Sequence, residues 1–271
     1  PNPCLRCNEK IKFEAVLRRG LALGFDAVAT GHYALTREND GVVRLFRSAE
    51  PAKDQSYVLG VLNQEQLAHS LFPLGPAASK AGVRAEAAAL GLSVARKPDS
   101  NDICFIASGD TPGYLRAHLG EREGDILDEQ GQVVGRHLGA AQFTVGQRRG
   151  LHLGRPAADG LPRYVIRTDV AANTVTVGPR ASLAVAAMRG IKLTWTEAQV
   201  TAPWRGLAQW RAHSTPAPAE FSYPDGGLRV ELDEPACGLA PGQQVVCYDG
   251  ERVVGSAVIS QTAGPGDRLA G

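Results

Sequence analysis

The sequence changes its pattern near Gly109, and this change constrains the fold more than any other feature. Before it, segments typical of helices alternate with short apolar segments: a helix is predicted from Asn8, as its cap, through Leu23, and "DAVATGHY" indicates a buried strand. After it, strands pair across tight turns, as in "GDILDEQGQVVGRH", "RYVIRTDVAANTVTVGP" and "QQVVCYDGERVVGSAVI". We therefore expect an α/β domain followed by mostly β structure.

Local signals refine the first part. Asp54, Asn63 and Ser79 stand where helix caps are expected, "LSVA" indicates another strand, and the later stretch "STPAPAEFSYPDGG" is expected to be a loop. The apolar stripe expected on the first helix consists of Ile11, Val16, Leu17 and Leu21. In open parallel sheets ligands bind beyond the carboxyl ends of the strands, so residues 30–32 are expected at a small-molecule site.

Composition excludes several classes of protein. The chain has 271 residues, 44% hydrophobic and 21% charged residues and a net charge of +1, as is typical of globular proteins. No run of 18 apolar residues and no basic-then-apolar leader occurs, so we expect no membrane contact and a cytoplasmic protein. The small net charge implies that any nucleic-acid-binding patch is local.

Cysteine spacing raises the main chemical question. Five cysteines are too few for a secreted disulfide scaffold, and Cys4 and Cys7 form a CxxC pair. Such a pair alone fits half of a zinc site, a redox dithiol or two buried small residues. No second CxxC follows to complete a zinc site, so these alternatives stay open at this point.

Six ordered motifs resemble one family. The motifs are similar to those of the tRNA-specific 2-thiouridylases: "NPCLRCNEKIKF", "ATGHYA", "KDQSYVLG", "LFPLG", "KPDSNDICFI" and "FTVGQRRGL". The resemblance is highly specific up to about Leu151 and weaker beyond it. The resemblance implies three parts: a partial adenine-nucleotide α-hydrolase-like α/β domain (1–108), a small central β-containing domain (109–180) and a C-terminal β-barrel (181–271).

The resemblance also implies an activity. Members of this family thiolate the wobble uridine of lysine, glutamate and glutamine tRNAs: AMP is transferred from ATP, with Mg, to the C2 oxygen, which sulfur then displaces. The expected partners are tRNA and a persulfide sulfur-donor protein; the identity of the donor and the oligomeric state stay open. Cys104 matches the persulfide carrier and Cys7 its partner. Arg96 and Lys97 would supply positive potential that favours the thiolate of Cys104, or would simply be a solvated basic pair. Cys4, Cys7 and Cys104 would instead be the ligands of a 4Fe-4S cluster in a second route proposed for the family.

Further site residues follow from the same resemblance. Asn2, Pro3 and Cys4 match the loop that meets the target base, and Gly31 matches a position that contacts ATP. The positions that match tRNA-contacting residues are His32, Lys53, Asp54, Gln55, Arg148, Arg149, Arg211 and Gln243. Ala212 stands where the family commonly has an aromatic residue, which weakens the match at Arg211. Without the resemblance, Asp54 would be interpreted as a helix cap and Gly31 as a turn residue.

One expected motif is absent from residues 1–271. The family's glycine- and serine-rich phosphate loop does not occur, and the sequence starts at Pro1 within a motif, so we expect a further segment before it. Two rival functions remain: a non-catalytic tRNA-binding module with a zinc-holding CxxC, and a related tRNA sulfurtransferase acting at another nucleotide.

Overall fold

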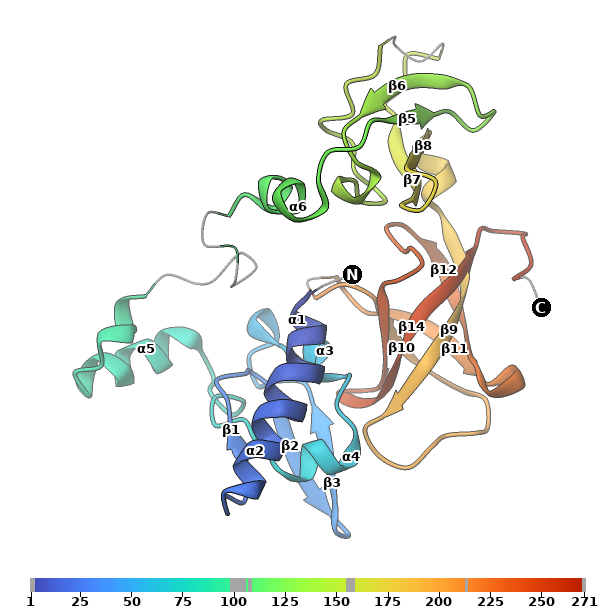
Figure 1. The fold of residues 1–271 in the computed structure, drawn as a ribbon. Coiled ribbons are helices and arrows are strands. Elements are labelled where there is room, and N and C mark those ends of the chain that lie inside the picture. Colours follow the sequence, from blue (N-terminus) through green and yellow to red (C-terminus); the bar gives the residue numbers. More distant parts are fainter. Residues whose placement is uncertain (1–2, 98–105, 107–108, 155–158, 213, 270–271) are drawn as a thin grey trace. The chain divides into compact units, whose positions relative to one another are not determined.

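The computed structural model describes residues 3–97, 106, 109–154, 159–212 and 214–269 (Figure 1). Two compact units make up the chain. Unit 1 contains residues 1–100, 188–233 and 242–260, and unit 2 contains residues 101–187, 234–241 and 261–271. The start of the sequence therefore shares a unit with most of the C-terminal strands, and the predicted three-part boundaries stay a prediction.

Unit 1 begins with one continuous helical segment that carries Cys4 and Cys7. Its parts are α1 (Pro3–Arg6), η1 (Cys7–Val16) and α2 (Leu17–Ala22). The middle part is a wide π-type helix, and at its end the Leu17 N–H bonds to Lys12 O, five residues back. Asn8 lies inside this helix, so its predicted role as the helix cap is wrong.

The wide helix explains which side chains point inward. The buried positions are Leu5, Asn8, Phe13 and Leu17. In an α-helix two residues five apart point roughly 140° away from each other, but a helix with fifth-residue bonds brings them back to one side. Asn8 and Phe13 thus both face the core, while Ile11 and Val16 of the predicted apolar stripe are 56% and 50% exposed. The predicted stripe was wrong at these two positions.

Short strands and helices follow in an α/β arrangement. Strands β1 (Val28–Ala29) and β4 (Ser70–Leu71) are parallel neighbours. The helices of this region are η2 (Pro51–Lys53), α3 (Ser56–Leu59), α4 (Gln64–Ala68), α5 (Lys80–Ala89) and η3 (Ser93–Arg96). The predicted strand within "DAVATGHY" is confirmed, but Val28 is half-buried and Ala29 exposed, so its predicted burial is wrong.

The helix caps test the local predictions. Asn63 caps α4 by accepting the Gln66 N–H at 2.9 Å, and Ser79 caps α5 by accepting the Gly82 N–H at 3.1 Å, so both predictions are confirmed. Gln55, not Asp54, precedes α3. The strand predicted at "LSVA" is wrong, because those residues enter the short helix η3.

The C-terminal strands close into a six-stranded barrel, as predicted. Their order is β13 (Gln244–Asp249), β10 (Trp204–Gln209), β11 (Ala217–Ser222), β12 (Leu228–Ala236), β9 (Val185–Trp195) and β14 (Arg252–Ala263). Pairing of β13 with both β10 and β14 completes the ring. The expected loop at "STPAPAEFSYPDGG" is wrong, because Ala219 and Phe221 alternate into the core from β11, before the turn η6 (Pro224–Gly226).

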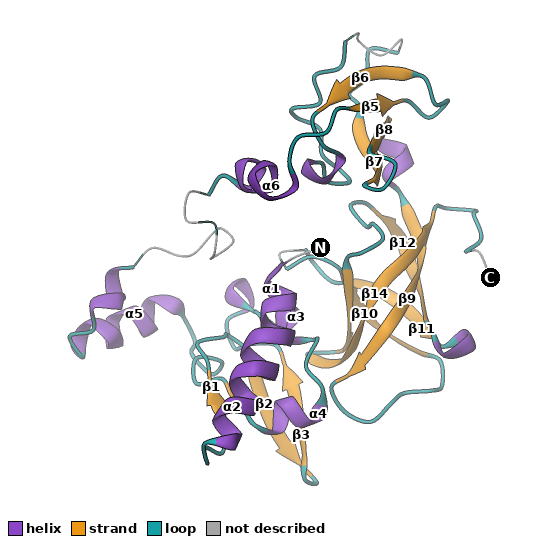
Figure 2. Cartoon of the chain, in the orientation of Figure 1, coloured by secondary structure: helices purple, strands orange, loops and turns teal. Residues whose placement is uncertain are grey.

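A hairpin from the first part of the chain extends the barrel sheet. Strands β2 (Leu35–Asn39) and β3 (Val42–Phe46) pair with each other, and β3 lies beside β14, with Phe46 opposite Arg252. Figure 2 shows these strands in the same colour as the barrel and the cysteine-bearing helix in purple. The hairpin thus joins two parts of unit 1 that are far apart in the sequence.

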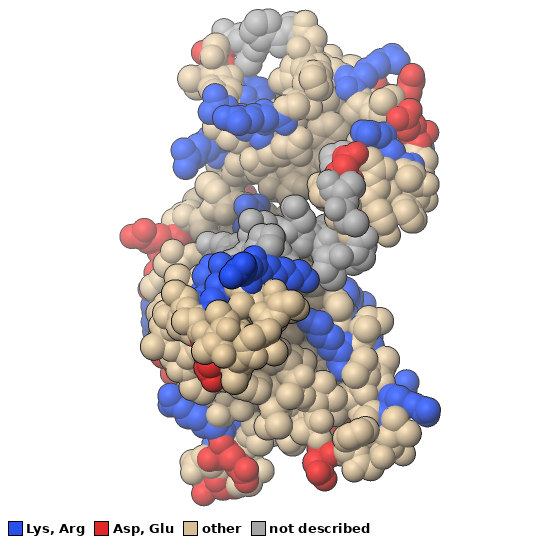
Figure 3. All heavy atoms as spheres, turned by 90° about the vertical axis from the view of Figure 1, so that its left-hand side faces the viewer, with Lys and Arg blue, Asp and Glu red and all other residues tan. Residues whose placement is uncertain are grey.

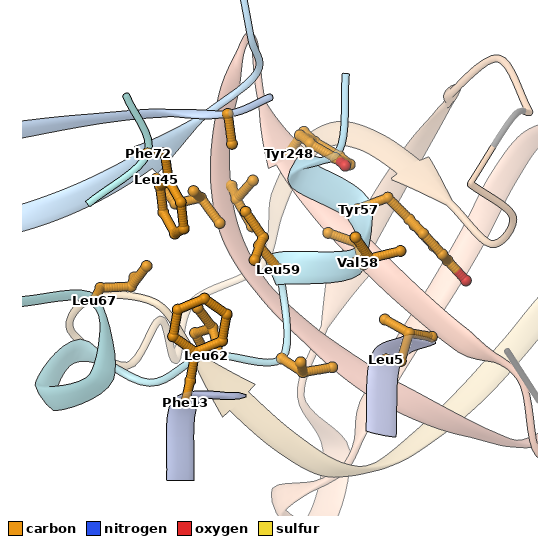
Figure 4. Close-up of a cluster of buried hydrophobic side chains, with 14 residues drawn as sticks. Leu5, Phe13, Leu45, Tyr57, Val58, Leu59, Leu62, Leu67, Phe72 and Tyr248 are labelled. Atoms are coloured by element: carbon orange, nitrogen blue, oxygen red, sulfur yellow. The ribbon is translucent and has the colours of Figure 1, made fainter. Parts of the chain in front are cut away.

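Residues from both parts form one hydrophobic core. Leu5 and Phe13 come from the helix, Tyr57 and Leu59 from α3, and Tyr248 from β13 (Figure 4). All five are nearly inaccessible to solvent. Burial of apolar side chains from both parts therefore stabilises their association.

Unit 2 is built on a four-stranded sheet. The strand order is β6 (Val133–His137), β5 (Gly124–Leu127), β8 (Thr174–Gly178) and β7 (Tyr164–Asp169). Its helices are α6 (Thr111–Leu119), η4 (Ala140–Gln142) and η5 (Arg180–Leu183). Both hairpins predicted in this region are confirmed. The part of the chain that the structure describes holds no helix with the length and apolar character needed to cross a membrane.

Candidate active site and RNA-contacting surface

Cys4 and Cys7 lie one helical turn apart near the start of the helix. Cys4 is exposed and Cys7 half-buried, whereas Leu5 between them and Asn8 after them are buried. Residues three apart in a helix lie on the same side, so both thiols are presented together. Pro3 starts the helix, where a missing N–H costs nothing, and Asn2 and Cys104 lie outside the described residues.

The remaining cysteine of unit 1 has a different environment. Cys247 lies in β13 and is buried, and burial raises the pKa of its thiol. A thiol of this kind stays protonated and is a poor nucleophile. Among the described residues, no group of three His, Cys, Asp or Glu side chains is arranged to hold a metal ion.

The segment after β1 contains a buried histidine. The His32 Nδ1 lies 2.8 Å from Thr30 Oγ1, and its Nε2 lies 3.4 Å from the Lys12 ammonium, which can only donate. This arrangement favours the tautomer with the proton on Nδ1. Burial, and then the charge of Lys12, lower the pKa of His32 to about 4. His32 is thus a neutral core residue packed between Phe13 and Phe72, and its tRNA contact stays a prediction.

Gly31 lies beyond the carboxyl end of β1, at the position predicted for a ligand. It is exposed, and a Cβ placed there would meet only Leu74, at 3.7 Å. Packing does not require a glycine at this position. Without a side chain, the exposed backbone at Gly31 leaves room for a ligand to approach closely.

Lys53, Asp54 and Gln55 hold the entry to α3. The Asp54 carboxylate accepts the Ser48 N–H at 2.9 Å and the Ser56 hydroxyl at 2.7 Å. Gln55 accepts the Tyr33 N–H at 3.0 Å, while Lys53 is half-buried. Asp54 and Gln55 thus form structural hydrogen bonds, and the tRNA contacts of residues 53–55 stay a prediction.

Basic residues gather on the segment of α5 and η3. Arg84, Arg96 and Lys97 are exposed, and the Arg84 guanidinium donates to Lys97 O at 2.8 Å. Figure 3 looks onto the side of α5, and blue atoms of Lys and Arg gather over this segment. Arg96 and Lys97 are the pair predicted to favour the thiolate of Cys104. Cys104 itself lies outside the described residues.

Arg211 and Gln243 occupy two connections of the barrel. Arg211 is exposed in the turn after β10, and Gln243 is half-buried just before β13. The buried Gln209 amide donates to Arg211 O at 2.9 Å and to Ala212 O at 3.3 Å. The turn is therefore shaped from within the core, a feature that the sequence did not predict.

Arg148 and Arg149 belong to unit 2. Both are exposed in the loop before β7, and the Gln147 amide donates to Arg149 O at 3.0 Å. Backbone bonds from Gly146 N–H to Val165 O and from Val165 N–H to Gln147 O attach the loop to β7. The loop presents two cationic side chains on a fixed backbone, a form suited to phosphate contacts.

Comparison with known families gives three matches, which together cover most of the chain. Residues 1–108 match the family described as tRNA methyl transferase HUP domain, residues 112–179 the tRNA methyl transferase PRC-barrel domain, and residues 185–259 the aminomethyltransferase beta-barrel domain. These matches agree with the predicted order of α/β domain, central β-containing domain and C-terminal barrel.

Individual relatives are similar over almost the full chain. The tRNA-specific 2-thiouridylase MnmA of Cutibacterium acnes is 59% identical over 262 residues, which are 97% of this chain and 71% of the relative. The protein of the same name from Streptomyces avermitilis is 58% identical over 265 residues, 97% of this chain and 70% of the relative. That from Nocardioides sp. is 56% identical over 278 residues, covering 100% of this chain and 74% of the relative.

Proposed function

Because this chain belongs to the family of tRNA-specific 2-thiouridylases, we propose that it catalyses ATP-dependent 2-thiolation of the wobble uridine of tRNA. The observation that most supports this function is a match that extends over all three parts of the chain and includes the cysteine-bearing helix. We take the substrates to be tRNAs of the lysine, glutamate and glutamine type. Because tRNA and ATP are found in the cytoplasm, we place the reaction there.

The chemistry assigns separate tasks to ATP and to sulfur. The C2 oxygen of uracil is a poor leaving group, so ATP, entering with Mg²⁺, transfers AMP to it and releases pyrophosphate. A persulfide on Cys104, supplied by a donor protein, attacks C2 through its terminal sulfur, and AMP leaves. The Cys7 thiolate then attacks the Cys104 sulfur, which breaks the S–S bond, leaves sulfur on C2 and forms a Cys7–Cys104 disulfide. Exposure of the first helical turns is compatible with this role for Cys7.

The second route uses the same helix differently. Cys4 and Cys7 lie on one side of it, and thiolates are the ligands that iron–sulfur clusters take. With Cys104 they would hold a 4Fe-4S cluster, whose open iron would supply a bound sulfide. Under this route Cys4 is required, whereas under the persulfide route it only lines the target-base loop.

The RNA would be bound by residues of both units. We assign phosphate contacts to Arg148 and Arg149, and tRNA contacts to Arg211 and Gln243 on the barrel, to His32 and to residues 53–55. Gly31 would contact ATP. The assignments of Arg148, Arg149 and Arg211 are supported by the exposure of these side chains and that of Gln243 by its partial exposure, whereas His32 is buried.

Nucleoside mass spectrometry tests the function. The complete natural protein is incubated with ATP, a persulfide donor and unmodified tRNA, and the product is digested and sequenced. We expect 2-thiouridine at the wobble position, dependent on ATP and absent with Cys7→Ala. A thiolated nucleotide elsewhere would favour the rival sulfurtransferase, and zinc in the protein without any thiolation would favour the binding module.

A further inference from the structure

Helix α3 lies between the cysteine-bearing helix and the barrel. All four of its residues are buried, and the Asn8 side chain donates to Val58 O at 2.9 Å. On its other side, a Cβ on Gly60 would approach Val246 Cγ1 to 2.9 Å, so the end of α3 fits tightly against β13. A single short helix thus touches both the segment that carries Cys7 and a strand of the barrel.

The Tyr57 hydroxyl of α3 reaches two barrel carbonyls at once. It lies 3.0 Å from Trp210 O and 3.2 Å from Gln244 O. These carbonyls belong to the chain neighbours of Arg211 and Gln243, the two barrel residues assigned to tRNA. Burial raises the pKa of Tyr57, so the hydroxyl keeps its proton and can donate it to either carbonyl.

The same turn is held by a second side chain from the N-terminal part. Arg47 Nη2 lies 3.4 Å from Gln209 Oε1, and its guanidinium stacks 4.1 Å above the Tyr248 ring. Gln209 in turn donates to Arg211 O. The backbone at Arg211 is therefore fixed by contacts that begin at Tyr57 and Arg47, both of which lie outside the barrel.

We propose that Tyr57 is a positioning residue for tRNA: its hydroxyl holds the turn at Arg211 and the chain at Gln243 in the arrangement that binds RNA, at a fixed place relative to the cysteine-bearing helix. This inference rests on the proposed function for the assignment of Arg211 and Gln243. A buried carbonyl that loses its donor is unfavourable, so removal of the hydroxyl would let both connections shift toward water or other donors. Tyr57 would touch no RNA itself.

Tyr57→Phe in the complete protein removes only the hydroxyl. We expect the KM and Kd for tRNA to rise about fivefold, the factor for one ordinary hydrogen bond, with kcat at saturating tRNA nearly unchanged. The matched control is Tyr248→Phe, which keeps the ring on which Arg47 stacks and removes only a hydroxyl of the same core that contacts Ser56 Oγ, at 3.2 Å. Its KM should stay at the wild-type value even if its Tm falls as much.

A double-mutant cycle separates positioning from general loosening of the core. In an Arg211→Ala, Gln243→Ala background, Tyr57→Phe should no longer change the Kd for tRNA, because the residues it positions are gone. An equal effect in both backgrounds, or an equal effect of Tyr248→Phe, would overturn the inference.

A further variant covers the case in which Tyr57→Phe does not fold. Gln209→Met removes the donations to the same turn from the barrel side and should also raise the Kd; an unchanged Kd would overturn the role of the turn. If the wild-type protein binds tRNA without thiolating it, the proposed function fails, while the binding comparisons still decide the role of Tyr57.

Discussion

Two stretches assigned to RNA use the same local device in different surroundings. In the barrel turn, Gln209 donates to the carbonyl of Arg211, two residues on; in the loop of unit 2, Gln147 donates in the same way to Arg149. Gln209, however, is buried and bonded to Arg47 of the N-terminal part, whereas the contacts of Gln147 are to Thr144, Arg149 and Val165 nearby in unit 2.

This difference separates two ways of binding RNA. The barrel turn is connected through buried groups to the helix that carries Cys7, so under the proposed function it would fix where the RNA lies relative to the chemistry. The loop of unit 2 presents exposed charge on a locally braced backbone, so its proposed contribution to RNA binding would be electrostatic and sensitive to salt. Changes in the first region should alter geometry and stability, and changes in the second should alter the salt dependence.

Replacing Cys7 by alanine should have the largest effect, because it removes chemistry without touching either RNA-binding region. Thiolation should fall by at least roughly a thousandfold, the scale on which enzymes lose rate when a nucleophile is removed. The Kd for tRNA should not change, since Cys7 is only half-buried and the Asn8 side chain still holds the helix on α3. A Cys7→Ala protein that thiolates normally would remove the helix from the active site.

Replacing Cys4 by alanine decides between the two sulfur routes. We expect iron content and activity to fall together while tRNA affinity is retained, because three thiolates would hold the cluster. Iron and tRNA affinity must be measured on the same anaerobic samples, since Cys4 also lies beside the expected target base. An active Cys4→Ala protein without iron, which forms a Cys7–Cys104 disulfide in a single turnover, would establish the persulfide route instead.

The sequence predicted the features that depend on local chemistry. Asn63 and Ser79 cap helices because their side chains reach backbone N–H groups three residues on, and Asn173 and Gly250 form hairpin turns because they tolerate positive φ, here 56° and 58°. Of the barrel, only the hairpin around Asp249-Gly250 was predicted from local signals, and the barrel itself was implied by the motif resemblance. The CxxC spacing pointed to Cys4 and Cys7, whereas the resemblance alone added Cys104 and the RNA-contacting residues.

Features that depend on distant contacts could not be predicted. The wide turns at Cys7–Val16 bring Asn8 inward to a carbonyl fifty residues away. An asparagine before a helical pattern is also typical of a cap, so the residue type alone did not distinguish the two roles. Tyr57 finds its acceptors just after β10 and at the start of β13, more than 150 residues along the chain. A buried tyrosine needs a partner for its hydroxyl, so the residue type gave a signal, but nothing local identified that partner.

Acid should weaken the buried region around His32. The unfolded chain binds a proton near the ordinary pKa of 6.5, but the folded chain does so only near 4, so stability is full above 6.5 and is lost as pH falls toward 4. The difference corresponds to about 3 kcal/mol in the free energy of unfolding. In urea titrations His32→Gln should flatten this dependence; His137 of unit 2 has its pKa lowered in the same direction and remains in both proteins. An equally steep pH dependence in the variant would show that His32 titrates normally.

The smallest effect, and the one specific to the exposed loop, concerns salt. Each phosphate contact made by a cation contributes roughly 0.7 to 0.9 to the slope of log K against log salt, because bound counterions are released. Replacing Arg148 and Arg149 together by alanine should therefore flatten that slope by up to about two units. The matched control is Arg167→Ala, which removes an exposed arginine of the same unit from β7 that pairs with Asp169 at 3.6 Å. Its slope should stay unchanged, because that charge is already compensated.

If the double variant binds tRNA more weakly at every salt concentration with the slope of the wild type, the loop would act through geometry, as is proposed for the barrel turn, and the distinction between the two regions would be lost.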